Sequence, residues 1–171
     1  MKVGLFIMLA ALFCSCISGC KTVRYMKDIS QVSYTSESGT ILPELQWYEQ
    51  IVITSNKVTL TRNGKTTNTE INAGTWEFAV DEQKVTAFFE QLEAIDCSSI
   101  KEVKPDEPTE GGGNETYSIV HTSDKTFHLK YGQGTTYTDG MLIVKPIDAF
   151  IESLTLPAGA ANRYKSSTNQ P

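Results

Sequence analysis

The pattern of apolar and polar residues predicts two amphipathic helices. Apolar residues recur at the spacing i, i+3, i+4 and i+7 in two places, first at Val85, Phe88, Phe89 and Leu92, then at Ile147, Phe150, Ile151 and Leu154. This spacing gathers them on one face of a helix. Asp81 fits the N-cap of the first helix, and Pro146 fits the first position of the second.

Six short stretches, most of them with alternating apolar and polar residues, are predicted to form strands. They cover residues 47–54, 57–62, 75–80, 117–122, 126–131 and 141–144. A two-residue turn at Ser55-Asn56 would place the apolar residues of the first two strands on one face. Asn63-Gly64 is typical of a further tight turn.

The predicted elements recur in two halves of the chain. Residues 51–57 match residues 119–125 at five of seven positions, and each copy is followed by another strand and then by a helix. Duplication would explain this pattern, and chance similarity between two hairpins is the alternative. The predicted fold class is α+β, with two quasi-repeated ββ-β-α units that form one antiparallel sheet with two helices packed on one face.

The two histidines, His121 and His128, belong to the second predicted hairpin. A three-residue turn at 123–125 would pair residue 121 with residue 127, so that His121 faces inward and His128 faces outward. Histidines on opposite faces cannot share a metal ion, whereas a two-residue turn would place both on one face. We therefore expect no metal site.

The net charge argues against nucleic acid and anionic lipid surfaces as partners. The chain has 15 Lys and Arg against 20 Asp and Glu, a net charge of −5 at pH 7. A mildly acidic protein without a basic run is a poor partner for nucleic acid. Charge alone would not hold it on an anionic lipid surface either.

The first residues have the organisation of an export signal. Lys2 precedes an apolar run of 11 residues, 3–13, and small residues follow. This run is too short for a membrane span, which needs about 17 to 25 residues. The next four residues, Ile17-Ser18-Gly19-Cys20, resemble the lipobox of bacterial lipoproteins. An uncleaved or conventionally cleaved signal is the alternative.

The lipobox resemblance implies cleavage between Gly19 and Cys20 and a covalent diacylglycerol, usually with a third acyl chain such as palmitate, on Cys20. Several chains hold a protein firmly on a membrane, so we expect a membrane anchor and no other cofactor. Lys21 follows the cysteine, where Asp is the familiar inner-membrane retention signal. Resemblance to that sorting pattern favours the outer membrane, on its periplasmic side.

These features divide the chain into four parts. We expect a signal peptide at 1–19, a lipidated tether at 20–44, a single α+β domain at 45–157 and a disordered tail at 158–171. Apolar residues such as Val32 and Tyr34 leave open that part of the tether docks as an extra strand. Cys97 is the only cysteine after Cys20, so no intramolecular disulfide is expected, and we interpret it as a small buried residue.

The candidate binding residues lie in two predicted loops. Asp106, Glu107 and Glu110 belong to the connection 101–114, and Tyr131 and Tyr137 belong to the loop 131–140. The acidic residues lack the alternating spacing of a calcium-binding loop, which favours a solvated acidic loop. No catalytic motif is present, so no catalytic residue is predicted.

The sequence therefore indicates an exported, membrane-anchored lipoprotein of the cell envelope. Our preferred hypothesis is a non-catalytic binding or assembly module, with another envelope protein as its candidate partner. The alternative is a hydrolase that acts on envelope polymers through carboxylates. A cleft with clustered carboxylates of perturbed pKa would favour the enzyme, and a shallow aromatic patch would favour binding.

Overall fold

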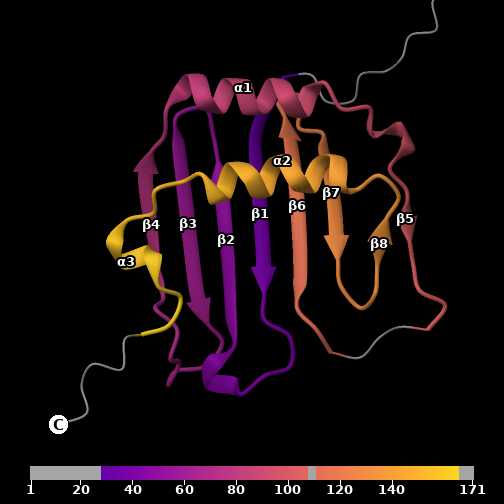
Figure 1. Ribbon diagram of the computed structural model, residues 1–171. Helices are drawn as coiled ribbons and strands as arrows, with labels where there is room; N and C mark the ends of the chain where they lie inside the picture. Colours follow the sequence, from indigo (N-terminus) through magenta and orange to yellow (C-terminus); the bar gives the residue numbers. More distant parts are fainter. Residues whose placement is uncertain (1–27, 108–110, 166–171) are drawn as a thin grey trace, which may run out of the picture.

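A six-stranded antiparallel sheet forms the centre of the protein in the computed structural model, which describes residues 28–107 and 111–165 (Figure 1). The strand order is β4-β3-β2-β1-β6-β7. The bounds are β1 Ile29–Glu37, β2 Trp47–Ile53, β3 Lys57–Gly64, β4 Gly74–Ala79, β6 Asn114–His121 and β7 Thr126–Tyr131. Two short strands, β5 (Glu102–Val103) and β8 (Thr136–Tyr137), pair with each other in a separate ribbon.

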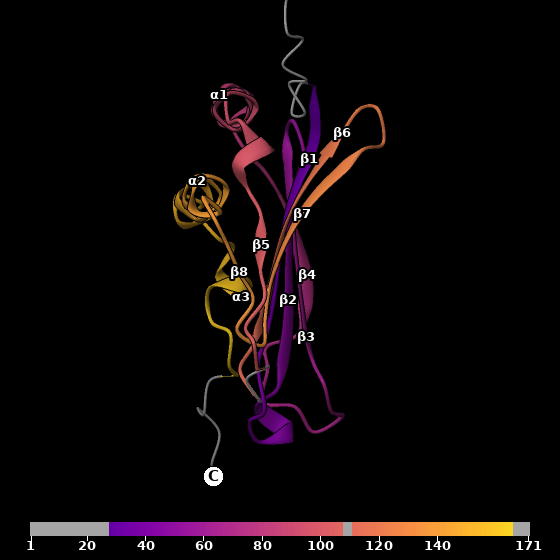
Figure 2. The same cartoon turned by 90° about the vertical axis from the view of Figure 1, so that its right-hand side faces the viewer.

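The helices cover one face of this sheet. They are α1 (Glu82–Glu93), α2 (Met141–Glu152) and the short α3 (Ala158–Ala161). Figure 2 shows all three on the same side, and Figure 1 shows α1 and α2 running across the strands. The α+β class is confirmed, with a six-stranded antiparallel sheet that has the helices on one face. No helix among the described residues is long and apolar enough to span a membrane.

The core lies between the sheet and the two longer helices. Its fully buried side chains come from both layers and include Ile53, Leu60, Ile119, Leu92 and Ile147. Burial of each such side chain contributes about 1.5 to 3 kcal/mol. The outward positions of the central strands are mostly polar, because alternate side chains along a strand point to opposite faces.

The first helix confirms the sequence prediction. Asp81 is its N-cap, and the side chain accepts hydrogen bonds from the backbone N–H groups of Gln83 (2.8 Å) and Lys84 (3.1 Å). The predicted stripe of Val85, Phe88, Phe89 and Leu92 is buried. Phe88 also stacks on Phe150 of α2, with ring centroids 4.3 Å apart.

The start of the second helix was predicted wrongly. Residues 141–144 are the first residues of α2 rather than a strand, and Pro146 lies inside the helix. A short apolar run without alternating polar residues fits a buried strand or a helix equally well. Ile143, Val144, Ile147 and Phe150 are its buried residues.

The expected boundary between tether and domain at residue 44 is also wrong. Residues 29–37 were assigned to the tether, with docking as an extra strand left open, and they form β1, which pairs with both β2 and β6 at the centre of the sheet. Its outward positions carry Ser33 and Thr35, so the segment has too few apolar residues to resemble a central strand. The structured domain therefore begins about 16 residues earlier than expected.

The expected tail at 158–171 is wrong for its first half. Residues 158–161 form α3, and Tyr164 makes an isolated bridge with Ile71. The backbone N–H of Asn72 also donates to the carbonyl oxygen of Arg163 at 2.8 Å. The C-terminal segment through residue 165 is thus part of the folded domain, although its small polar residues show no periodicity.

The Asn63-Gly64 pair does not form the expected tight turn. Gly64 remains in β3, opposite Trp47 of β2. A Cβ atom at Gly64 would lie 1.9 Å from Oγ1 of Thr69, so close packing requires glycine here. Glycine is therefore required at position 64 by close packing against Thr69 and not by a tight turn.

The two hairpins have the predicted faces but not both predicted turns. Thr54 N–H donates to Lys57 O at 2.9 Å, which confirms the two-residue turn at Ser55-Asn56. In the second hairpin Ile119 pairs with Phe127, so the turn comprises residues 122–124 rather than 123–125. Asp124 has a positive φ of 60°, as expected at the end of a three-residue hairpin loop.

This shift of two residues in the pairing leaves the histidines on their predicted faces. His121 is buried on the helix side of the sheet, and His128 points to the other face, where its Nδ1 lies 2.9 Å from Oγ of Ser118. An even-numbered shift in the pairing keeps each side chain on its own face.

Candidate ligand-binding cleft

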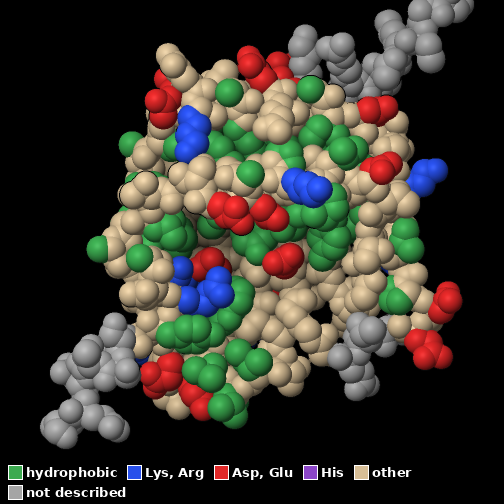
Figure 3. Space-filling model, viewed as in Figure 1, with side chains coloured by type: hydrophobic (Ala, Val, Ile, Leu, Met, Phe, Trp, Pro, Cys, Tyr) green, Lys and Arg blue, Asp and Glu red, His purple; other side chains and the backbone are tan. Residues whose placement is uncertain are grey.

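The longer helices leave one end of the sheet uncovered on the helix side. A cleft of about 720 Å³ opens there between the end of β1, the C-terminal segment and two glycine-rich loops. Figure 3 shows a hollow below α2, with acidic and basic side chains gathered around it. Tyr34, Ser36 and Glu115 belong to its floor, Trp47 and Arg163 to one side, and Tyr131 to the other.

The glycine-rich wall of the cleft is held against the sheet by close backbone packing. A Cβ atom at Gly39 would lie 2.3 Å from the carbonyl carbon of Gly112, and one at Gly113 would lie 2.4 Å from Glu37 O. Gly112 also has a positive φ of 91°. Only glycine permits both the approach and this backbone conformation, so residues 111–113 form a backbone-lined wall.

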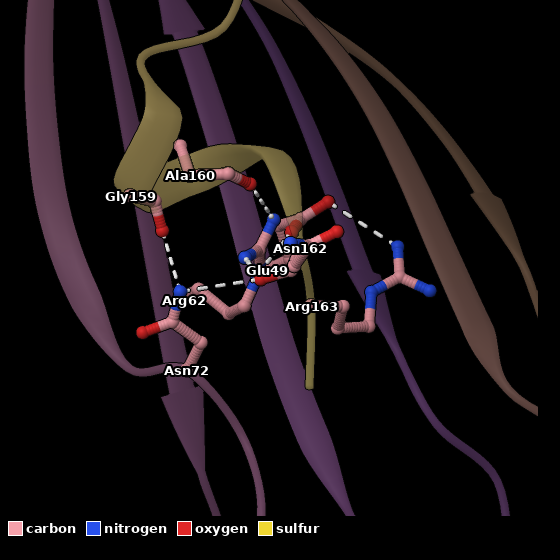
Figure 4. A network of polar contacts seen from close by, with 7 residues as sticks. All are labelled: Glu49, Arg62, Asn72, Gly159, Ala160, Asn162 and Arg163. Carbon is pink, nitrogen blue, oxygen red and sulfur yellow. Dashed lines mark hydrogen bonds and ion pairs between the residues drawn. The ribbon is translucent and has the colours of Figure 1, made fainter. Parts of the chain in front are cut away.

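A buried ion pair fixes the C-terminal segment at the side of the cleft (Figure 4). Glu49 and Arg62 are only 6% and 3% exposed, and Nε of Arg62 lies 2.5 Å from the carboxylate of Glu49. Arg62 also donates to the carbonyl oxygens of Ala160 (3.1 Å) and Asn162 (2.9 Å). One strand residue thereby holds the chain that follows α3.

Arg163 is held in the cleft by two contacts. Its guanidinium carbon lies 3.9 Å from the ring centroid of Trp47, and its Nη2 lies 3.4 Å from Glu49 Oε1. Figure 4 shows this guanidinium apart from Arg62, with Glu49 between the two. Among the described residues, no hydrogen-bond partner lies against the buried Nε of Arg163. Two arginines share one carboxylate, so this side of the cleft carries net positive charge.

Two carboxylates are paired with tyrosines, of which Glu115 lines the floor of the cleft and Asp148 does not line it. The hydroxyl of Tyr34 donates to Oε1 of Glu115 at 2.8 Å, and that of Tyr117 donates to Oδ1 of Asp148 on α2 at 3.1 Å. The rings of Tyr34 and Tyr117 are 5.1 Å apart. Tyr131 continues the group, 5.9 Å from Tyr117 and edge-on to it.

Burial sets the protonation of this group. It raises the pKa of both Tyr34 and Tyr117, mainly by desolvation, so both phenols stay protonated and act as donors at neutral pH. Burial also raises the pKa of Asp148, with further contributions from the negative charges of Glu115 and Glu152. The hydrogen bond from Tyr117 opposes that rise.

The raised pKa of Asp148 predicts a pH-dependent cost to stability. The folded chain binds this proton more tightly than the unfolded chain, so stability falls as pH rises from the ordinary value of 3.8 through the raised pKa. Asp148→Asn removes the titration and keeps an acceptor for Tyr117. We expect the variant to melt at a higher temperature than wild type near pH 7, with the difference shrinking toward about pH 3. A difference independent of pH in thermal melts would contradict this account.

Of the binding residues predicted from the sequence, the two tyrosines line hollows in the surface and the described acidic residues do not. Tyr131 lines the cleft and also an adjacent hollow of about 590 Å³, and Tyr137 lines only the latter. A Cβ atom at Gly140 would lie 2.4 Å from the Tyr131 hydroxyl, so glycine lets this ring pack at the start of α2. Asp106 and Glu107 are exposed and line neither hollow.

Other predicted residues lie elsewhere or beyond the structure. Glu110, Gly19 and Cys20 are outside the described residues. Cys97 is half-buried, and desolvation, followed by the nearby charge of Asp96, raises the pKa of its thiol to about 11. This thiol is therefore a poor nucleophile at neutral pH. Within the described part of the chain, no group of three His, Cys, Asp or Glu side chains could hold a metal ion.

Sequence reasoning missed most of the cleft. Glu49 and Arg62 stand at inward positions of alternating strands, which was the available signal that they are buried and paired. Glu115 and Asp148 are 33 residues apart and come from a strand and a helix, and no spacing rule connects them. Comparisons of the chain with protein-family models, with curated proteins and with solved structures gave no match.

Proposed function

We propose that the protein is an exported lipoprotein, anchored through a lipid on Cys20, whose domain binds a component of the cell envelope in the cleft. The observation that carries the binding role is the cleft itself, with Arg163 fixed on Trp47 at one side and Glu115 bonded to Tyr34 in the floor. Charged groups in fixed positions around a concave surface are typical of a ligand site.

The direction of β1 supports the anchored arrangement. Ile29 begins the strand beside the end of α1, where its N–H donates to Glu93 at 3.0 Å, and Glu37 ends it at the cleft. Nine residues of strand cover about 30 Å. The chain between Cys20 and Asp28 spans at most about 29 Å. The anchor therefore attaches at the end of the domain opposite the cleft, which leaves the cleft open to the periplasm. We place the anchor in the outer membrane.

Crosslinking in intact membranes tests the binding role. A photoreactive phenylalanine analogue at Gln133, in the cleft wall, should give a discrete adduct that mass spectrometry identifies. The same analogue at Thr59, on the outward face of β3, is the matched control. Capture from Gln133 alone supports the proposal. No adduct from Gln133, or equal adducts from both positions, would overturn it.

A second function, hydrolysis of an envelope polymer, is favoured by one observation. Burial raises the pKa of Asp148 and the nearby charge of Glu115 raises it further, as in carboxyl pairs that divide the roles of acid and base. This reading requires turnover of isolated envelope polymer by the wild type and its loss in both Asp148→Asn and Glu115→Gln. Binding of the polymer without turnover would support the binding role and contradict the hydrolase.

The relation between the two halves is also a proposal. β2, β3, β4 and α1 follow in the same order as β6, β7, β8 and α2, and β1 separates the two groups in the sheet. β8 departs from the pattern because it pairs with β5. We infer a duplication in which the third strand of the second half moved out of the sheet. Aligning the two halves across homologous sequences would test this relation.

A further inference from the structure

We infer that the cleft recognises a short peptide segment with a free carboxylate and a free amine, the carboxylate at Arg163 and the amine at Glu115. This inference rests on the proposed binding role and adds the chemical class of the ligand. It rests on two opposite charges that line the same cleft, Arg163 and Glu115, each of which can form further hydrogen bonds with a ligand.

The register of the sheet sets the separation of the two charges. Glu49, which holds Arg163, is opposite Ser36, and Ser36 is opposite Glu115 on the other side of β1. Two strand spacings amount to about 10 Å. Among the described residues, Arg163 forms its ion pair with Glu49 and none with Glu115. A ligand with both charges, several bonds apart, could reach both.

The Arg163 side is prepared for a carboxylate. The guanidinium is stacked on Trp47 and paired with Glu49, so little side-chain freedom is lost on binding. Glu49 is already neutralised by Arg62, which leaves the positive charge of Arg163 largely uncompensated. The Arg163 side chain is still 39% exposed, so its outer guanidinium nitrogens can donate to a ligand carboxylate.

The Glu115 side is prepared for an ammonium group. Within residues 28–107 and 111–165, neither Glu115 nor Asp148 forms an ion pair. Tyr34 stays protonated and donates to one oxygen of Glu115, so the carboxylate is oriented without being neutralised. An ammonium group here would relieve the repulsion between Glu115 and Asp148 and could contact the ring of Tyr131.

The walls favour a peptide over other ligands with both charges. Residues 111–113 and 132–134 line the cleft, and five of these six are glycines. Their peptide groups are unshielded by side chains, so they can form hydrogen bonds with the backbone of an extended segment. A purely anionic ligand would be repelled by Glu115, and a purely cationic one by Arg163.

Calorimetric titration of the full chain in detergent micelles tests the inference. The probe is Nα-acetyl-L-lysine, which has a free carboxylate and a free amine. Nα-acetyl-L-norleucine lacks the amine, and Nα-acetyl-L-lysinamide lacks the carboxylate. We expect each of these two to bind about tenfold more weakly than the probe, because each loses one charge-assisted contact.

Two variants assign each charge to its residue. Glu115→Gln retains an acceptor for Tyr34 and should abolish only the preference for the amine. Arg163→Gln should abolish only the preference for the carboxylate. Glu77→Gln, an exposed position of β4 paired with Lys57, is the matched control and should bind as wild type does. Thermal melts confirm that each variant is folded.

The outcomes separate this inference from the proposed function. Equal binding of the three compounds, no binding of Nα-acetyl-L-lysine, or discrimination that persists in a folded Glu115→Gln variant overturns the inference. If the Gln133 crosslink is nevertheless specific, the binding role stands and its ligand belongs to another chemical class. If that crosslink is also absent, both fail.

Discussion

Arg62→Met is expected to lower the free energy of unfolding by about 3 kcal/mol, the lower end of the range for breaking a buried ion pair. The substitution leaves Glu49 in a site where it is 6% exposed, and its remaining partner is Arg163 at 3.4 Å. The carbonyl groups of Ala160 and Asn162 also lose their bonds to Arg62. Urea denaturation near pH 7 measures the effect.

A matched control lies on the same strand. Lys57 pairs with Glu77 at 3.0 Å on the outward face, where both side chains are about half exposed. Lys57→Met should change stability by less than about 1 kcal/mol, because solvent screens an exposed pair. Similar losses for the two variants would show that burial of Arg62 has no energetic consequence.

A double variant distinguishes the contribution of the Glu49–Arg62 ion pair from that of the other contacts of Arg62. Replacing Glu49 by Leu together with Arg62→Met removes both charges, so it should be less destabilising than the sum of the two single changes. Strict additivity would mean that Arg62 stabilises the fold mainly through the C-terminal carbonyl groups.

The helix–sheet core was predictable because its signals are local. The stripe from Val85 to Leu92 and the turn at Ser55-Asn56 follow from periodicity and were found in place. The central strand was not predictable in the same way. Ser33 and Thr35 point away from the helices, so β1 has few apolar residues, and its central place comes from pairing with β2 and β6 on its two sides.

The cleft could be predicted only in fragments. Tyr131 was singled out because an aromatic residue at a loop is a common contact residue, and it lines the cleft. Glu115 and Arg163 come from segments 48 residues apart, and the second was assigned to a disordered tail. What brings them together is the register of β2, β1 and β6 and the bonds from Arg62 to the C-terminal segment, which are long-range contacts without a local signature.

Cys20→Ala is expected to move the protein completely from the membrane fraction to the soluble fraction. Each buried methylene contributes about 0.8 kcal/mol, and one chain alone gives only marginal attachment, so two or three chains account for firm binding. Fractionation and metabolic labelling with palmitate measure the change. Cys97→Ala is the matched control, because Cys97 is half-buried in the domain, and it should remain labelled and membrane-bound. Label that persisted in Cys20→Ala would contradict the anchor.

The same variant separates anchoring from recognition. β1 runs from Ile29 to Glu37 at the cleft, and in the described part of the chain no residue that lines the cleft precedes Tyr34. Cys20→Ala should therefore bind Nα-acetyl-L-lysine with unchanged affinity while losing the Gln133 crosslink in membranes. If the released protein also lost affinity for the probe, the membrane would have to contribute to the site. Unchanged affinity with lost capture would mean that the lipid supplies the location and the cleft supplies the selectivity.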